Sequence, residues 1–326
     1  MPLNIYWPGV VFYAFLAIVL IQLAYYLYFF RRVAFYKPPV RQKSQQHPVS
    51  VIVCARDEAA RLTRNLTGLL VQEYPTTHEV IVVNHNSQDE TQYLLEEFKK
   101  THKQLQAVNL SQEAKGIPGK KYPLSIGIRE ARHEMLLLTD ADCVPASELL
   151  IQKMQDGYGD DTEIVLGYGA YHKKPGLLNK LIRFETFHTA LQYLSYALAG
   201  KPYMGVGRNL SYRKEIFFKH KGFSSINHIP GGDDDLFISK AATKANTGVV
   251  IDPEAHTLSD PKTSFREWLR QKNRHYTTGK YYKAAHKWLL GIYSFSQLLF
   301  YPLFIASLLL FDWRLGKRVD ADRKST

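Results

Sequence analysis

Residues 5–30 contain no charged side chain, and this segment restricts what the start of the chain can fold into. It is long enough to cross the hydrocarbon core of a bilayer, about 30 Å thick, where every backbone polar group must be hydrogen-bonded within the segment. A helix satisfies that requirement. The basic pair Arg31 and Arg32 follows the segment instead of preceding it. We therefore expect a membrane span, not a cleaved signal peptide, with the residues after it in the cytoplasm.

A second apolar stretch, residues 288–311, has Pro302 at its middle and basic residues on both sides. These flanks fit a full span, a kinked re-entrant hairpin or a helix in the interface, and we prefer the span. The chain has a net charge of +12, and its basic residues gather beside the two apolar segments. This distribution favours a membrane partner over a nucleic acid. The two cysteines, Cys54 and Cys143, provide no disulfide framework.

Strand-like and helix-like patterns alternate between the two apolar segments. Apolar runs at residues 49–54, 79–83 and 135–138 predict buried strands. Helices are expected after the first two of them, one from the pattern of Leu62, Leu66, Leu69 and Leu70 and one at residues 91–100. The alternation predicts a parallel sheet flanked by helices. Polar residues follow all three strands, at the edge where such a sheet binds its ligands.

The third of these strands ends in two carboxylates, Asp140 and Asp142, one residue apart. Residues i and i+2 of a strand point to the same side, so both side chains can converge on one cation. Carboxylate oxygens suit Mg²⁺ or Mn²⁺, which in turn hold phosphate oxygens. The alternative is a polar turn that closes a buried strand.

Several motifs follow one another along residues 49–282 in an order that resembles the membrane-anchored bacterial glycosyltransferases of family 2. They are Ala55-Arg56-Asp57-Glu58 after the first strand, Asn84-His85 after the second, Gly119-Lys120-Lys121, Asp140-Ala141-Asp142, Gly207-Arg208-Asn209, Gly232-Asp233-Asp234-Asp235 and Gln271-Lys272-Asn273-Arg274-His275. The resemblance implies the α/β GT-A fold of nucleotide-diphospho-sugar transferases, with a mixed, mostly parallel sheet flanked by helices.

The resemblance also implies a nucleotide-sugar donor and Mn²⁺ or Mg²⁺ held by Asp140 and Asp142. It implies Asp233 as the catalytic base, with Asp234 as the second choice. The residues that it assigns to nucleotide or substrate binding are Ala55, Arg56, Glu58, Asn84, His85, Lys120, Asp140, Arg208, Asn209, Gln271 and Arg274.

The chemistry of sugar transfer explains why these residue types are needed. Negative charge develops on the diphosphate leaving group, and a cation together with Lys120 and Arg274 would stabilise it. The acceptor hydroxyl must lose a proton, and crowding among the three carboxylates at 233–235 makes at least one of them more basic. A single displacement inverts the anomeric centre. The acidic run has another interpretation, a solvated helix N-terminus.

Two positions depart from the family pattern. His85 stands where the family usually has an Asp that hydrogen-bonds the nucleotide base, so uridine cannot be assumed. His275 replaces the aromatic Trp of the last motif and offers a poorer platform for a sugar ring. We therefore expect a single transfer instead of processive polymer synthesis.

Two further helices are expected near the membrane. Apolar residues at 265, 268 and 269 predict a basic amphipathic helix, whose Arg274 can serve the site or face lipid phosphates, two roles that are compatible. Residues 177–198 predict a helix that faces the core or the membrane, with His188 as a structural residue.

We expect six parts along the chain. They are a membrane helix at 1–31, a basic linker at 32–47, the GT-A domain at 48–262, an amphipathic interface region at 263–287, a membrane segment at 288–312 and a basic tail at 313–326. The expected function is inverting, metal-assisted sugar transfer from a nucleotide sugar to a lipid-linked or cell-surface glycan acceptor, on the cytoplasmic side of the cell membrane and without nucleic acid. Two alternatives remain, a non-catalytic nucleotide-sugar binding or assembly protein and a nucleotidyltransferase.

Overall fold

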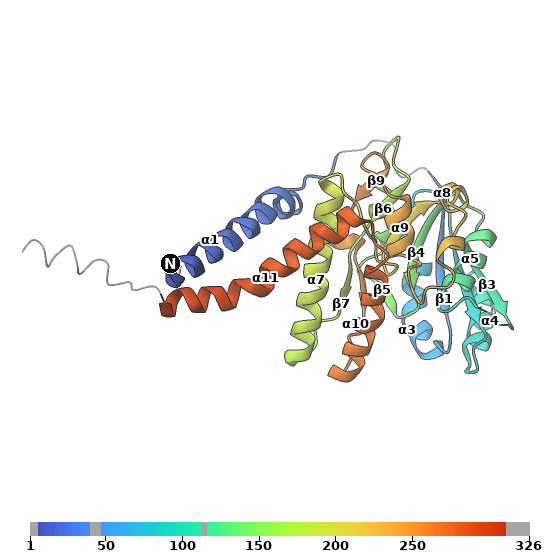
Figure 1. Ribbon diagram of the computed structural model, residues 1–326. Helices are drawn as coiled ribbons and strands as arrows, with labels where there is room; N and C mark the ends of the chain where they lie inside the picture. The colour runs from blue at the N-terminus through green and yellow to red at the C-terminus, as the bar shows by residue number, and fades with distance from the viewer. Residues whose placement is uncertain (1–5, 40–46, 113–115, 311–326) are drawn as a thin grey trace, which may run out of the picture. The chain divides into compact units, whose positions relative to one another are not determined.

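The computed structural model of the protein describes residues 6–39, 47–112 and 116–310 (Figure 1). The chain divides into two compact units, Arg32–Lys283 and the pair of end segments Met1–Arg31 and Ala284–Thr326. The basic tail expected at 313–326 and the linker residues 40–46 lie outside the described residues.

The larger unit contains strands and helices in alternation. Its strands are β1 (Val49–Ala55), β2 (His78–His85), β3 (Leu105–Leu110), β4 (Met135–Asp140), β5 (Cys143–Pro145), β6 (Ile164–Leu166), β7 (Gly169–Tyr171), β8 (Leu210–Arg213), β9 (Thr247–Val249) and β10 (Thr257–Ser259). Its helices are α3 (Ala59–Leu70), α4 (Thr91–Thr101), α5 (Lys121–Glu130), α6 (Leu150–Gln155), α7 (Leu177–Leu198), α8 (Lys214–Lys219), η2 (Ser224–Ile226), α9 (Asp235–Ala241), η3 (Pro253–Ala255) and α10 (Phe265–Gly279). The strands and helices expected from the first three apolar runs are all present.

Seven strands form one sheet in the order β3-β2-β1-β4-β8-β6-β9. The first four are parallel, β8 is antiparallel to both of its neighbours, and β6 and β9 are parallel. A second sheet has the order β5-β10-β7. The sheet is thus mixed and mostly parallel, as expected. The carboxyl ends of β1, β2 and β4 lie at one edge, which is where the polar motifs follow the strands.

Helices pack on both faces of the large sheet. On one face, Val49, Val51 and Val53 of β1 join a buried core with α3, α4 and α6, because α3 repeats its leucines at helical spacing. On the other face α5 packs so closely that a Cβ atom on Gly127 would lie 2.8 Å from Ile52 and 2.9 Å from Val83. A glycine there brings the start of α5, with its lysines, against the sheet edge.

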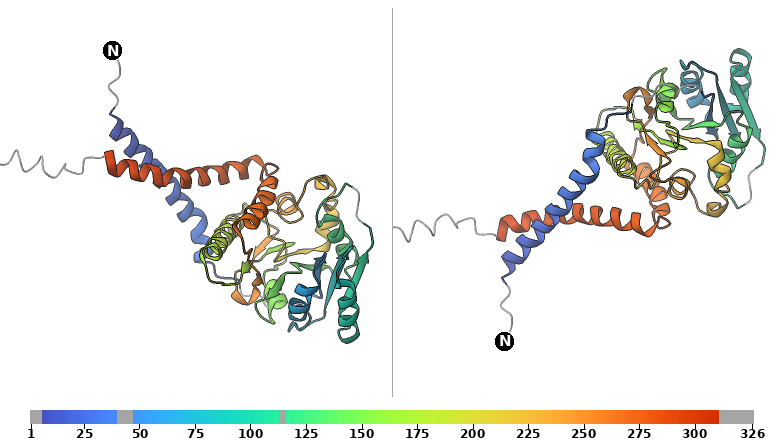
Figure 2. Two further views of the ribbon diagram at one scale, coloured as in Figure 1. Left: turned by 90° about the horizontal axis from the view of Figure 1, so that it is seen from below. Right: turned by 90° about the horizontal axis from the view of Figure 1, so that it is seen from above.

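The smaller unit consists of two apolar helical segments that cross each other (Figure 2). The first comprises α1 (Trp7–Tyr25), a π-helical turn η1 (Tyr26–Phe30) and the short α2 (Arg31–Ala34), which extends into the larger unit. The second is α11 (Ala284–Leu310). Tyr25 Oη donates to the Leu289 carbonyl at 2.6 Å, and Gln22 Nε2 donates to the Ser296 carbonyl at 3.1 Å.

Both segments are long and apolar enough to cross a membrane, a test of length and composition alone. The helix α11 continues through Pro302, so the expected alternative of a re-entrant hairpin is wrong. A helix of 27 residues is about 40 Å long at 1.5 Å per residue, which exceeds the hydrocarbon thickness of about 30 Å. It also begins four residues before the expected boundary at 288.

Candidate functional site

The register of the parallel strands aligns the predicted site residues at the carboxyl edge of the sheet. Cys54 of β1 lies opposite Asp140 of β4, and Ala55 lies opposite Asn84 of β2. Because parallel strands end at the same edge, the loops that follow them share one location. The strand order therefore brings together motifs that are up to 85 residues apart in the chain, from Ala55 to Asp140.

The centre of the site is an ion pair between the Lys120 ammonium and Oδ1 of Asp140. Desolvation would raise the pKa of Asp140, but Lys120, Arg208 and Arg274 lower it below the usual value. Desolvation would lower the pKa of Lys120, but the carboxylates of Asp140 and Asp233 raise it well above the usual value. Both groups are therefore charged at neutral pH.

A cavity opens beside this pair. Its polar lining comes from the ends of β1 and β4, the start of α5, the loop before β8 and the loop before α9, and consists of Cys54, Lys120, Thr139, Asp140, Gly207, Asp233 and Asp234. Asp233 and Asp234, far from Lys120 in sequence, thus share one cavity with it. The structure brings together the lysine motif, the first metal carboxylate and the acidic run.

Each carboxylate of the acidic run has a different environment. Asp234 is the N-cap of α9 and accepts from the backbone N–H groups of Asp235 and Gly207, at 2.7 and 2.8 Å. Asp235 accepts from the hydroxyls of Thr278 and Tyr282. Asp233 is 9% exposed and lines the cavity. One interpretation of the run was a solvated helix N-terminus. Asp234 does cap the N-terminus of α9, but the run is largely buried and not solvated.

Burial raises the pKa of all three carboxyl groups above the ordinary value. For Asp233, Lys120 opposes the shift, and the neighbouring Asp234 adds to it. A carboxylate with a raised pKa is a stronger base than an exposed one. Asp233 and Asp234 both combine a raised pKa with a position on the cavity, and Asp234 is in addition held as the cap of α9.

The second metal carboxylate, Asp142, lies near Asp140 and Cys143. One possible ligand atom from each of the three lies within 4.8 Å of the other two. Burial and the charge of Asp140 raise the pKa of Asp142, and burial raises that of the Cys143 thiol to about 12. Two converging carboxylates fit a hard divalent cation, which would offset their repulsion. A protonated thiol does not fit such an ion, so Asp140 and Asp142 are the candidate ligands.

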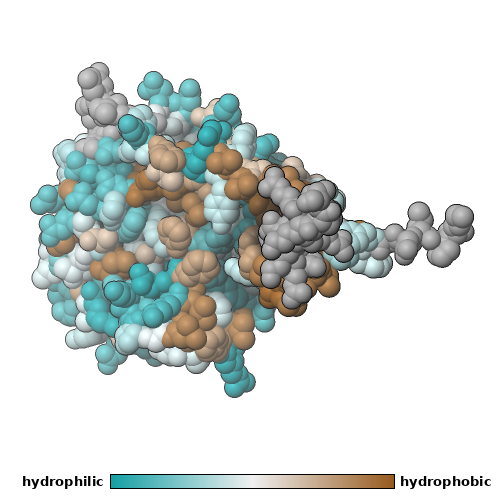
Figure 3. All heavy atoms as spheres, turned by 90° about the vertical axis from the view of Figure 1, so that its left-hand side faces the viewer, coloured by the Kyte–Doolittle hydropathy of each residue, from teal (hydrophilic) through white to brown (hydrophobic). Residues whose placement is uncertain are grey.

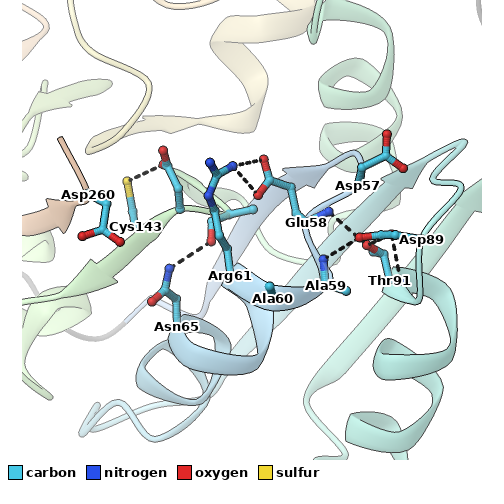
Figure 4. Close-up of polar contacts among 12 residues, drawn as sticks. Asp57, Glu58, Ala59, Ala60, Arg61, Asn65, Asp89, Thr91, Cys143 and Asp260 are labelled. Atoms are coloured by element: carbon cyan, nitrogen blue, oxygen red, sulfur yellow. Dashed lines mark hydrogen bonds and ion pairs between the residues drawn. The ribbon is translucent and has the colours of Figure 1, made fainter. Parts of the chain in front are cut away.

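Hydrogen bonds between the first two loops brace this edge of the sheet (Figure 4). The Asp57 N–H donates to Ser87 Oγ at 2.9 Å, and the Ala59 N–H donates to Asp89 Oδ2 at 3.0 Å. Glu58 is a predicted binding residue, and both of its carboxylate oxygens accept a hydrogen bond from Arg61 Nη1 at 2.6 Å. In Figure 4, Arg61 lies between Glu58 and Cys143.

Arg208 and Gln271 come together around Tyr171 of β7. The Arg208 guanidinium lies over the Tyr171 ring, 4.4 Å from its centroid, and Gln271 Nε2 donates to the Tyr171 hydroxyl at 3.3 Å. The Arg208 carbonyl accepts from Thr139 Oγ1 at 2.9 Å, next to Asp140. Arg274 is exposed on α10 and close enough to lower the pKa of Asp140. Arg208 and Arg274 both lower the pKa of Asp140.

Two predicted binding residues are buried and form hydrogen bonds within the chain instead. Asn209 is fully buried and donates to the carbonyls of Tyr168 and Ala255 at 3.1 and 2.6 Å. Asn84 is 3% exposed and bonds Asn109 Oδ1 at 3.0 Å. His85 ends β2, with its ring centroid 6.2 Å from that of Tyr122, and Arg56 is exposed in the loop after β1. None of these four lines the cavity among the described residues.

Sequence reasoning missed the residues that hold the acidic loop. Lys121 is 1% exposed, and its ammonium donates to the carbonyls of Ile229 and Gly231, the latter at 2.7 Å. Thr278 and Tyr282 bind Asp235 from the end of α10 and beyond. The one sign of this anchor in the sequence was the second lysine, Lys121, directly after Lys120. The pattern alone does not say which of the two lysines faces the carboxylates.

Comparison with known proteins identifies the family. The family model described as "Glycosyltransferase like family 2" matches residues 47–278, a segment that includes every predicted site residue. The chain belongs to glycosyltransferase family 2. The expectation drawn from the sequence motifs is therefore confirmed at the level of the family.

Relatives of this family 2 chain include a beta-monoglucosyldiacylglycerol synthase from Trichormus variabilis, 34% identical over 126 residues, which cover 36% of this chain and 26% of that protein. The glycosyltransferase AglE from Haloferax volcanii is 28% identical over 233 residues, 69% of this chain and 71% of that protein. The match to the synthase thus spans about a quarter of its length.

The family 2 fold is also found among solved structures. The mannosyltransferase PcManGT from Pyrobaculum calidifontis, solved in complex with GDP-Man and Mn²⁺, superposes with a TM-score of 0.66 at 19% identity and covers 93% of this chain and 85% of its own. This likeness confirms the GT-A-like fold.

The contacts of Lys121 generate a stability prediction. Replacing its ammonium in Lys121→Met leaves buried carbonyls of the acidic loop without a donor, which costs about 1–3 kcal/mol. We expect the free energy of unfolding, measured by denaturant titration of the purified chain in detergent, to fall by that amount. The exposed Lys100, paired with Glu97, is the control, and Lys100→Met should change stability by less than about 0.5 kcal/mol. Equal effects in the two variants would contradict the anchoring role.

Proposed function

We propose that this family 2 chain transfers a sugar from a nucleotide-sugar donor to an acceptor at the membrane, a lipid-linked intermediate or a cell-surface glycan. The observation that carries the proposal is the convergence of Lys120, Asp140 and Asp233 on one cavity at the carboxyl edge of the sheet. The family match and the two apolar helical segments support it. Both named relatives are enzymes of sugar transfer, and the solved mannosyltransferase holds GDP-Man.

The donor's diphosphate would be bound by cations around the carboxylates. Asp140 and Asp142 would hold Mn²⁺ or Mg²⁺, which when bound neutralises charge on the diphosphate leaving group. The solved mannosyltransferase binds Mn²⁺, which supports this choice of ion. Lys120, Arg208 and Arg274 supply fixed positive charge beside the carboxylates, and such preorganised charge stabilises the transition state without reorganisation of water.

Asp233 would act as the general base. Its carboxylate takes the proton from the acceptor hydroxyl, the acceptor oxygen forms a bond to the anomeric carbon, and the bond from that carbon to the diphosphate oxygen breaks. The nucleoside diphosphate leaves with the electron pair of that bond, and the single displacement inverts the anomeric centre. The raised pKa of Asp233, caused by burial and by Asp234, supports this role.

The first prediction tests transfer and its metal requirement together. The purified chain is incubated with a panel of nucleotide sugars and Mn²⁺ or Mg²⁺, and released nucleoside diphosphate is measured. We expect release with at least one donor, its loss with a chelator, and a loss of metal-dependent turnover in Asp142→Asn, which removes charge with little change in volume. Donor binding without release from any sugar would favour a non-catalytic binding protein. Full activity of Asp142→Asn would contradict the metal assignment.

The second prediction concerns the base. Asp233→Asn should keep donor affinity within a few-fold and lower transfer by roughly 10²–10⁴. Because the base must be ionised and burial raises its pKa, kcat of the unsubstituted chain should fall at acidic pH, with a midpoint above the ordinary Asp value of about 3.9. Asp234→Asn is the matched comparison. If that variant alone shows the large loss in transfer, the base is Asp234 and the assignment is wrong by one residue.

The third prediction concerns topology. Arg31 and Arg32 should retain the following domain on the cytoplasmic side, where nucleotide sugars are available. A compartment-sensitive reporter fused near Lys43 should therefore give a cytoplasmic signal, and one fused after Thr326 an exterior signal. A cytoplasmic signal at both positions would show that α11 does not span the membrane.

A further inference from the structure

Two loops supply part of the lining of the cavity. Residues 201–209 connect α7 to β8 and contribute Gly207, and residues 227–234 precede α9 and contribute Asp233 and Asp234. We call them the 201–209 loop and the acidic loop. The Gly207 N–H donates to Asp234 Oδ2 at 2.8 Å, which joins the two loops directly. One hydrogen bond contributes only about 0.5–1.5 kcal/mol, so a further contact between the loops would matter for the shape of the cavity.

Tyr282, in the turn after α10, makes a second connection between the two loops. Its hydroxyl donates at 2.7 Å to Oδ2 of Asp235, the residue that directly follows the acidic loop. The same hydroxyl lies 4.0 Å from the sulfur of Met204 in the 201–209 loop. The Tyr282 ring packs edge-on against that of Tyr203 in this loop, with the ring centroids 5.8 Å apart. One side chain therefore contacts both loops.

The ring that Tyr282 contacts in the 201–209 loop is itself well supported. Tyr203 is buried and packs against the buried Tyr196 of α7, with the ring centroids 5.4 Å apart. The Lys201 N–H donates to the Tyr196 carbonyl at 2.8 Å, so the loop is fixed to α7 where it begins. Buried, interdigitated rings resist displacement, because a shift leaves part of their contacts unmade. Tyr282 therefore packs against a rigid part of the larger unit.

On the other side, Tyr282 binds a carboxylate close to the proposed base. Asp235 is the first residue of α9, and its Oδ2 also accepts from the Thr278 hydroxyl. Its Oδ1 accepts from the Leu236 N–H at 2.7 Å, so both oxygens have partners. Successive Cα atoms are about 3.8 Å apart, and Asp233 lies only two residues before Asp235. Fixing the Asp235 carboxylate therefore restricts where Asp233 can lie.

The adjacent Tyr281 has a different environment. It is 46% exposed, and the Lys280 ammonium lies 5.0 Å from its ring centroid. Figure 3 shows hydrophobic residues among hydrophilic ones on the surface that it views, so an exposed aromatic ring is ordinary for this chain. Tyr282 is only partly exposed and binds residues of two cavity loops. The two neighbouring tyrosines thus provide a matched comparison.

We propose that Tyr282 is a positioning residue for sugar transfer, which holds the acidic loop to the 201–209 loop and thereby places Asp233 at the cavity. The inference rests on the proposed function and adds a residue that lies outside the segment 47–278 matched by the family model. Tyr282 acts through Asp235 and Tyr203 and is not part of the cavity lining. A displacement of about 1 Å can lower a rate by roughly 10²-fold, so such a residue can control transfer without binding the donor.

The first experiment measures the connection of the loops by hydrogen exchange and mass spectrometry of the full chain in detergent. Tyr282→Phe retains the ring and removes the hydroxyl, whereas Tyr282→Leu removes both contacts. We expect exchange in the acidic loop to become roughly tenfold faster in Tyr282→Phe, and exchange in both loops to become faster in Tyr282→Leu.

Tyr281→Phe and Tyr281→Leu are the matched controls and should leave both loops as in the unsubstituted chain. Peptides from β3, at the far edge of the large sheet, should exchange equally in all variants, which shows that the fold is retained. If the substitutions at 282 and 281 have the same effect on the two loops, the proposal is overturned.

The second experiment separates positioning from donor binding. The Kd and the number of binding sites are measured by titration with the nucleotide sugar that supports release, and kcat is measured from the released nucleoside diphosphate. We expect Tyr282→Phe to lower kcat roughly tenfold, with Kd within a few-fold and the number of sites unchanged, and Tyr281→Phe to change none of them. An unchanged kcat in Tyr282→Phe would overturn the proposal. A loss of binding sites equal to the loss of kcat would also overturn it, because the role would then be structural.

The two proposals fail in different ways. If the unsubstituted chain releases nucleoside diphosphate from no donor, the proposed function is wrong, and hydrogen exchange still decides whether Tyr282 connects the loops. If the unsubstituted chain transfers sugar and Tyr282→Phe behaves like Tyr281→Phe in both experiments, only the positioning role is wrong.

Discussion

The candidate site depends on keeping several carboxylates ionised in a largely buried location. Asp140, Asp233 and Asp234 line one cavity, and burial alone would favour their neutral forms. The Lys120 ammonium offsets this by its ion pair with Asp140 and its attraction for Asp233. Burial and the charge of Asp140 raise the pKa of Asp142, against the opposing influence of Arg61, Arg208 and Lys120. The charge that remains uncompensated at Asp142 is what a divalent ion would neutralise.

The surrounding structure holds these charges at short range. The glycine at 127 lets α5 approach the sheet, so that Lys120 reaches Asp140 while Lys121 turns inward to the carbonyls of the acidic loop. Asp234 caps α9, and Asp235 binds Thr278 and Tyr282. The three neighbouring acids thus have three roles, as base candidate, helix cap and anchor of α10. The anchoring contacts fix the positions that the chemistry requires.

The same anchoring extends the site toward α7 and α10. Gln271 and Arg208 meet at Tyr171, and Lys272 on the same helix binds Glu185 of α7. One side of α10 therefore serves the site while another side exposes apolar residues. A basic amphipathic helix and a site helix were compatible interpretations of the sequence around Arg274. In the structure α10 has both characters, because a helix presents different residues on different sides.

Local patterns in the sequence were enough to predict the elements at 49–54, 79–83 and 135–138, the apolar helices and the family. Strand and helix periodicities are local, and the polar residues at strand ends follow from parallel pairing. The sequence also indicated Lys120, Asp140 and Asp233. It gave no role to the neighbouring Lys121, did not separate Arg208 from the buried Asn209, and did not reveal that α7 lies beside α10. Those distinctions were decided by the tertiary structure, because burial and hydrogen-bond partners depend on which distant segments pack together.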